Sequence, residues 1–153
     1  ALAKDCDLIF IDCPPLLEDD LCWKSLVVAD LILIPVPPSM GDVISSLQAG
    51  EFAAQARKQN PTLKISYFVS QYRRGMYHNS AVEKLRSKAT DPVLQTMITQ
   101  RAVFAETQER HCGLQWLDPN AKTPAMAELN ALADEVSSIL TIPKTKKKGK
   151  GTR

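Results

Sequence analysis

A carboxylate stands at the end of a short apolar run near the beginning of the chain. Residues 8–11 are all apolar, and Asp12, Cys13 and two prolines follow them. A short apolar run bounded by turn residues predicts a strand buried on both faces of a sheet. Because ligands bind at the carboxyl edge of open parallel sheets, Asp12 is placed to hold Mg²⁺ through water beside a phosphate. The alternative is that Asp12 only begins the next turn.

The elements that must position Asp12 follow from proline, capping and periodicity signals. Pro14 lacks an N–H and restricts Cys13, so the first strand must end there. Further strands are expected at residues 31–36, 64–69, 93–98 and 114–117, with pairing fading near Pro35. Helices are expected at residues 21–29, 43–59, 80–88, 102–110 and 124–140. Strand, helix and strand in close succession predict a right-handed crossover and parallel pairing.

Composition describes an ordinary globular protein of one domain. The chain has 153 residues, of which 44% are hydrophobic and 24% are charged, and its formal net charge is +2. No apolar run approaches the roughly 20 residues that a membrane span needs. The four cysteines follow no zinc spacing, which favours reduced thiols in the cytoplasm.

Two groups of basic residues could contact phosphates. Arg73 and Arg74 lie among aromatic residues in a loop after the strand at 64–69, where they either neutralise phosphates of DNA or nucleotide or form a solvated loop. The last ten residues are rich in lysine and are expected to be disordered. Lys146, Lys147 and Lys148 in this tail either attract DNA or only aid solubility.

Four segments together resemble one family. Residues 7–15 read D-L-I-F-I-D-C-P-P, residues 28–37 read V-A-D-L-I-L-I-P-V-P, residues 60–65 read N-P-T-L-K-I and residues 97–104 read M-I-T-Q-R-A-V-F. In this order they are similar to the ParA/MinD family of deviant P-loop ATPases, and the last segment is similar to plasmid-type ParA proteins. The resemblance runs from about residue 6 to residue 140.

The resemblance implies an α/β fold of three layers, with a mostly parallel sheet and helices on both faces. Residues 1–142 would be the C-terminal part of a P-loop NTPase-like domain, and residues 143–153 a disordered basic tail. The family's phosphate loop, K-G-G-x-x-K-[ST], does not occur in the chain. Since backbone N–H groups and a lysine of that loop bind the phosphates, we expect no ATP hydrolysis by this chain alone.

The resemblance also implies site residues. Asp12 would be the catalytic carboxylate on the metal side, holding Mg²⁺ through water. Residues that would lie near the nucleotide are Pro14 and Pro15 of the following switch, Ser70 and Gln71 near the adenine, and Arg101. Arg101 matches the family's arginine near the adenine pocket and the DNA-binding surface, which leaves both roles open. The alternative is that Arg101 has only a structural role and forms a salt bridge to Glu106 or Glu109.

By the same resemblance, the whole protein would bind Mg-ATP and dimerise with nucleotide between its subunits. It would coat DNA nonspecifically in the cytoplasm, at the nucleoid, and release it when a ParB-type partner stimulates hydrolysis, in plasmid or chromosome segregation. One rival is a non-catalytic DNA-binding or dimerisation module. Another is a relative that serves conjugation, surface-polymer synthesis or MinD-like membrane positioning, although the tail lacks the large apolar residues of a membrane helix.

Overall fold

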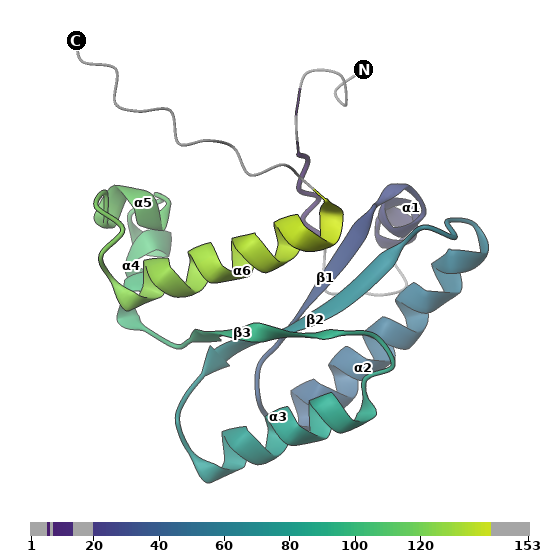
Figure 1. Ribbon diagram of the computed structural model, residues 1–153, viewed down its shortest axis with the longest axis horizontal. Helices are drawn as coiled ribbons and strands as arrows, with labels where there is room; N and C mark the ends of the chain where they lie inside the picture. The colour runs from purple at the N-terminus through teal and green to yellow at the C-terminus, as the bar shows by residue number, and fades with distance from the viewer. Residues whose placement is uncertain (1–5, 7, 14–19, 142–153) are drawn as a thin grey trace.

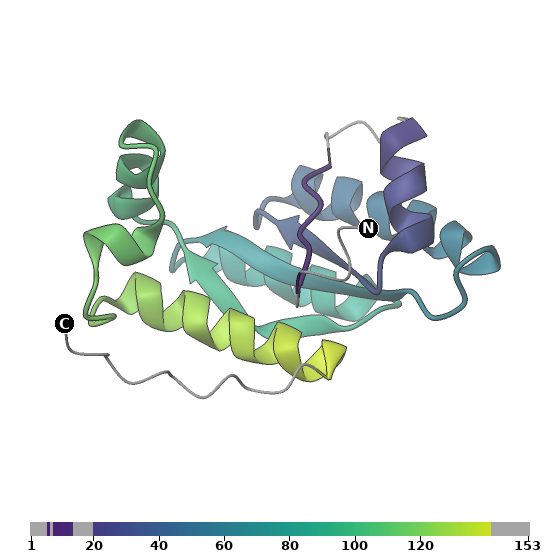
Figure 2. The same ribbon diagram turned by 90° about the horizontal axis from the view of Figure 1, so that it is seen from above.

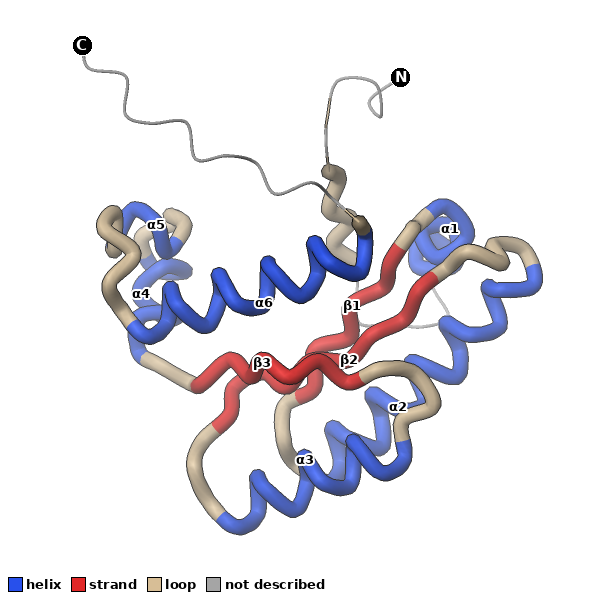
Figure 3. Tube along the Cα trace, in the orientation of Figure 1, coloured by secondary structure: helices blue, strands red, loops and turns tan. Residues whose placement is uncertain are grey.

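Three parallel strands form the centre of the molecule. The computed structural model describes Cys6, residues 8–13 and residues 20–141. Within these residues one sheet has the order β1 (Leu31–Val36), β2 (Lys64–Tyr72), β3 (Val93–Thr99). Helices lie on both faces of this sheet (Figures 1 and 3). The expected three-layer α/β fold with a parallel sheet is confirmed.

Some expectations concern residues outside the described part. These are the roles of Pro14 and Pro15 and the DNA contacts of the tail residues Lys146, Lys147 and Lys148.

The pairing of β1 with β2 shows why the apolar runs became strands. The register runs from Leu31 opposite Lys64 to Val36 opposite Val69. The expected loss of pairing near Pro35 is wrong, because Pro35 still lies opposite Phe68. Within the described residues β1 is an edge strand, where an N–H that faces away from the neighbour can be missing without loss of a ladder bond.

One face of the sheet is covered by α2 (Met40–Gln55), η2 (Ala56–Lys58) and α3 (Met76–Lys88). The main core lies here, and its members include Ile34, Val36, Val43, Ala53, Ile65, Tyr67, Val69 and Leu85. The α2 backbone packs directly on β2, since a Cβ atom built on Gly50 would lie 1.6 Å from the Tyr67 hydroxyl. A glycine at this position is therefore required by close approach.

The opposite face is covered by α6 (Pro124–Leu140), which packs against β3 (Figure 1). Thr123 caps this helix by accepting from the Met126 N–H, and Pro124 is its first residue, as expected. The Glu135 carboxylate accepts from the backbone N–H groups of Gln95 (2.9 Å) and Thr96 (2.7 Å), and from the Thr96 hydroxyl. These bonds occupy N–H groups on the outer edge of β3, which would otherwise be open to pairing.

The helix α1 (Asp20–Val28) lies beside the loop that leads into β2. The Asn60 side-chain amide donates to the carbonyls of Leu26 (3.2 Å) and Ala29 (2.7 Å), so it caps the end of this helix. Helix C-terminal carbonyls need such donors, because no further turn supplies them. This contact gives Asn60, in the N-P-x-L-K-I segment, a structural role.

Some of the sequence-based assignments of helices and strands are wrong. Residues 114–117 form α5 (Leu114–Leu117), a short helix after α4 (Ala102–Glu109), instead of a strand. No described strand lies beside it, and only Leu114 of this segment is buried, which a single helical turn achieves. The helix α3 begins at Met76 rather than Ser80, because contacts from the end of β2 hold its first turn. The helix at 43–59 ends at Gln55 and continues as the 3₁₀ turn η2.

Candidate functional site

The carboxyl ends of the three strands meet at one edge of the sheet. β1 leads through two prolines to Ser39, the N-cap of α2; β2 leads to Arg73 and Arg74; and β3 leads to Arg101, the N-cap of α4. This edge lies on the side of α4 and α5 in Figures 1 and 2. In parallel α/β sheets this is the edge where ligands bind, so it is the candidate site.

The end of β2 folds back on the first turn of α3. The Tyr72 hydroxyl donates to the Asn79 side-chain oxygen (2.6 Å), and the Arg73 N–H donates to Nδ1 of His78 (2.9 Å). The rings of Tyr72 and His78 also meet edge to face, with 6.0 Å between centroids. Nδ1 of His78 therefore serves as an acceptor for the backbone at the end of β2. His78 lies in the first turn of α3, and nothing in the residues beside it in the sequence indicates this contact.

Gln71 has an unusual backbone conformation at this edge. Its φ is 52°, in the left-handed region, and the β2–β3 register shifts between Val69 and Tyr72. A side chain other than glycine in this region costs about 1 kcal/mol or more, and such strain clusters at functional sites. The Gln71 side chain is exposed and Ser70 is half-buried, so of the two expected base contacts Gln71 is the more accessible.

Arg73 links the ends of β2 and β3. Its Nε donates to the Gln100 side-chain oxygen (2.6 Å), and the Gln100 N–H donates to the Tyr72 carbonyl (2.9 Å). Arg74 is exposed, and no ion pair joins it to a carboxylate in the described residues. Both arginines therefore place positive charge at the edge of the sheet. Arg73 is held there by Gln100, which lies in the loop after β3.

Arg101 is held by α6. Its Nη2 lies 2.7 Å from Oε1 of Glu128, whose carboxylate also accepts from the N–H and the hydroxyl of Thr99 (2.9 Å each). The alternative partners named from the sequence are wrong, since Glu106 pairs with Arg110 instead and Glu109 with no cation in the described residues.

The environment of Glu128 favours its charged form. Burial raises the pKa of this carboxyl, but the hydrogen bonds from Arg101 and Thr99 and the positive charge of Arg101 outweigh burial, so the pKa lies below its ordinary value. Nε of Arg101 is buried and has no hydrogen-bond partner within residues 20–141 and the described N-terminal residues. The guanidinium is thus fixed at the edge by Glu128, while its buried Nε donor has no partner among the described residues.

Asp12 lies in a different environment from the one expected. Residues 8–13 form no strand, and the large apolar side chains of Leu8, Ile9, Phe10 and Ile11 are 43 to 83% exposed. An isolated segment of four residues is not stable as a strand without a paired neighbour, and no described strand pairs with it. The expected buried strand is therefore wrong for this structure. Asp12 is exposed, and no hydrogen bonds to a neighbouring described strand hold its backbone in place.

Neither a metal cluster nor a membrane span occurs in the described residues. No group of three or more His, Cys, Asp or Glu side chains among them could hold a metal ion. None of the described helices is both long enough and apolar enough to cross a membrane.

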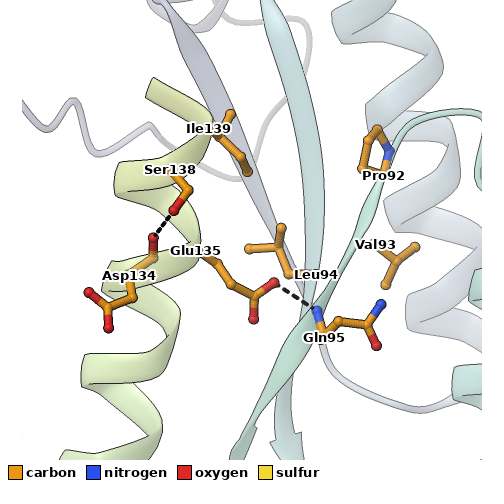
Figure 4. Close-up of a pocket in the computed structure, with 8 residues that line it drawn as sticks. All are labelled: Pro92, Val93, Leu94, Gln95, Asp134, Glu135, Ser138 and Ile139. Carbon is orange, nitrogen blue, oxygen red and sulfur yellow. Dashed lines mark hydrogen bonds between the residues drawn. The ribbon is translucent and has the colours of Figure 1, made fainter. Parts of the chain in front are cut away.

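The amino-terminal edge of the sheet also carries an open hollow of about 470 Å³ between β3 and the end of α6 (Figure 4). Pro92, Leu94 and Ile139 provide much of its apolar lining, and the Glu135 carboxylate beside it is already bonded to Gln95. This hollow lies at the opposite end of β3 from Arg101, so it does not belong to the candidate site.

Comparison with known proteins gives a strong match. Maintenance of carboxysome distribution protein A from Halothiobacillus neapolitanus is 31% identical to this chain over 130 residues. The two proteins are homologous. The match covers 85% of this chain and 60% of the relative, so the chain spans about three fifths of the length of that protein. No protein-family model matches the chain.

Proposed function

We propose that this chain is part of a ParA/MinD-type ATPase that positions an intracellular cargo. The observation that carries the proposal is the 31% identity, over 85% of this chain, to a protein named for maintaining carboxysome distribution. The four motif segments and the parallel three-layer fold agree with it. Cargo positioning is favoured over plasmid partition because the relative is named for the distribution of a cellular body.

In this proposal the whole protein binds Mg-ATP at the carboxyl edge of the sheet. Gln71 offers an exposed amide near the base, and Arg101, oriented by Glu128, stands at the same edge. Asp12 acts on the metal side once its segment is ordered by the nucleotide. Phosphoryl transfer depends on positioning and charge stabilisation, so these residues act by fixing the nucleotide and its metal.

The proposed assembly is a dimer that binds DNA nonspecifically at the nucleoid and is released by a partner protein that stimulates hydrolysis. Arg73 and Arg74 are the proposed DNA contacts, since both project from the edge loop and phosphate contacts carry nonspecific affinity. A ParB-type protein is one form that the partner could take.

The test is ATP hydrolysis by the full-length protein with Mg²⁺, with and without DNA. We expect turnover that is lost in Asp12→Ala, and no turnover by the 153-residue chain alone. A matched control is Asp30→Ala, which removes an exposed carboxylate just before β1, at the opposite edge of the sheet, and should leave turnover unchanged. Equal turnover in Asp12→Ala and in the unchanged protein would contradict the assigned role of Asp12.

A further inference from the structure

The helix α3 and the loop before it carry an excess of positive charge. Between residues 71 and 90 the chain has one carboxylate, Glu83, and these cations: Arg73, Arg74, Lys84, Arg86 and Lys88. All five cationic side chains are exposed. α3 forms the outer side of its layer, on the face of the sheet away from α6 (Figures 1 and 2). The three cations of α3 itself, Lys84, Arg86 and Lys88, form an external surface, here called the α3 ridge.

The helix α3 has one buried face and one exposed face. Ala81 and Leu85 are 1% and 0% exposed and anchor the helix on the core. Lys84 and Lys88 lie one helical turn apart, about 6 Å along the axis. Neither forms an ion pair with a carboxylate in the described residues. Arg86 differs, since its charge acts on Glu135 and helps to lower the pKa of that carboxyl.

Acidic residues limit the ridge on both sides. α2, in the same layer, carries Asp42 and Glu51, and α6, on the opposite face, carries Glu128, Asp134 and Glu135 with no lysine or arginine. A polyanion would therefore be attracted to α3 and its leading loop and repelled by the neighbouring helices. The sheet lies between α3 and α6, and Arg86 is the cation of the ridge whose charge acts on an α6 carboxylate.

We infer that the α3 ridge is a contact surface for the phosphate backbone of double-stranded DNA, together with Arg73 and Arg74 of the loop before α3. This inference rests on the proposed function and extends its DNA-binding surface by two residues, Lys84 and Lys88. α3 is about 20 Å long, a length over which one DNA strand presents about six phosphates. Flexible lysines that reach phosphates give affinity without sequence preference, which matches nonspecific binding.

The test is the salt dependence of DNA binding by the full-length protein with Mg-ATP, measured by fluorescence anisotropy on a duplex of random sequence. The double variant Lys84→Gln/Lys88→Gln is compared with Lys58→Gln/Lys122→Gln, which removes two exposed lysines outside the ridge. We expect the slope of log K against log [salt] to fall in magnitude by about 1.8 in the first variant, about 0.9 for each phosphate that a lysine no longer neutralises. The control should retain the slope.

The outcomes separate this inference from the function on which it rests. If Arg73→Ala/Arg74→Ala weakens binding while Lys84→Gln/Lys88→Gln leaves the slope unchanged, the ridge is not a contact surface and the proposed function stands. If the unchanged protein binds no DNA in any nucleotide state, both fail. An equal fall in slope for the ridge variant and the control would show a general effect of net charge. That result would also contradict the inference that the ridge contacts DNA. Thermal melts confirm that each variant is folded.

Discussion

Arg101 and Glu128 form an ion pair across the carboxyl edge of the sheet, with 2.7 Å between Nη2 and Oε1. Glu128 lies in the first half of α6, whereas Arg101 lies two residues after the end of β3, 27 residues earlier in the chain than Glu128. The same carboxylate also accepts from Thr99, the last residue of β3. The pair therefore joins a candidate site residue to the helix that covers the other face of the sheet.

Glu128→Gln should destabilise the fold. The amide cannot pair with Arg101 as an ion, and the guanidinium, already lacking a partner for Nε in the described residues, would lose its charged acceptor. Hydrogen bonds to charged groups contribute about 1.5–3 kcal/mol, so we expect the free energy of unfolding to fall by about that amount. Urea unfolding measures it. Glu109→Gln, at an exposed position on α4, is the control, and an equal effect of both changes would refute the importance of the pair.

Acid should weaken the attachment of α6. Burial raises the pKa of Glu128 and Glu135, but hydrogen bonds to each carboxylate outweigh it, so both pKa values lie below the ordinary 4.5. The unfolded chain then binds more protons in acid. The stabilisation is fully present above the ordinary pKa and is lost as pH falls through the folded-state values. Between about pH 6 and pH 3 the melting temperature should fall more steeply in the unchanged protein than in E128Q/E135Q. Parallel curves would contradict this account.

Gly50→Ala should be disruptive, because the added Cβ would overlap the Tyr67 hydroxyl at 1.6 Å. Overpacking of a core costs about 1–3 kcal/mol. Gly41→Ala is a matched control in the same helix, since a Cβ there meets nothing within 4 Å. It should be neutral or stabilising by up to about 1 kcal/mol, because alanine favours helix. Similar melting temperatures for the two variants would show that α2 can move away from β2 at little cost.

Gln71→Gly separates backbone strain from ligand contact. Glycine adopts a φ of 52° freely, so stability should stay within about 1 kcal/mol of the unchanged protein. ATP affinity of the full-length protein should nevertheless fall, since the exposed amide is removed. Ala121→Gly, also at a φ of 52° but outside the strand ends, is the control and should leave ATP affinity unchanged. Unaltered affinity in Gln71→Gly would remove Gln71 from the site.

The sequence predicted the strands and helix ends that are determined by neighbouring residues. Apolar runs located the strands at 31–36, 64–69 and 93–98, and the Thr123-Pro124 signal located the start of α6. Residues 8–11 (L-I-F-I) and 114–117 (L-Q-W-L) were also expected to be strands. Neither has a neighbouring strand in the described part of the chain, and a strand needs a partner that composition cannot supply.

The details of the candidate site depended on contacts between distant segments. Arg101 was predicted to be a site residue, but its partner Glu128 lies far along the chain and on the helix that covers the other face of the sheet. The contact between Arg73 and His78 joins a strand end to a helix that begins four residues earlier than its capping pattern indicates. Such pairings are decided by packing of the whole sheet, so local patterns do not reveal them.

The most direct test of the central proposal is retention of the full-length protein on nonspecific DNA with ATP, ADP or no nucleotide, each with Mg²⁺. The account predicts sequence-independent binding that requires ATP and is weakened in Arg73→Ala/Arg74→Ala. Absence of DNA binding in every nucleotide state, or binding that is the same with and without ATP, would contradict a positioning ATPase that acts on DNA at the nucleoid.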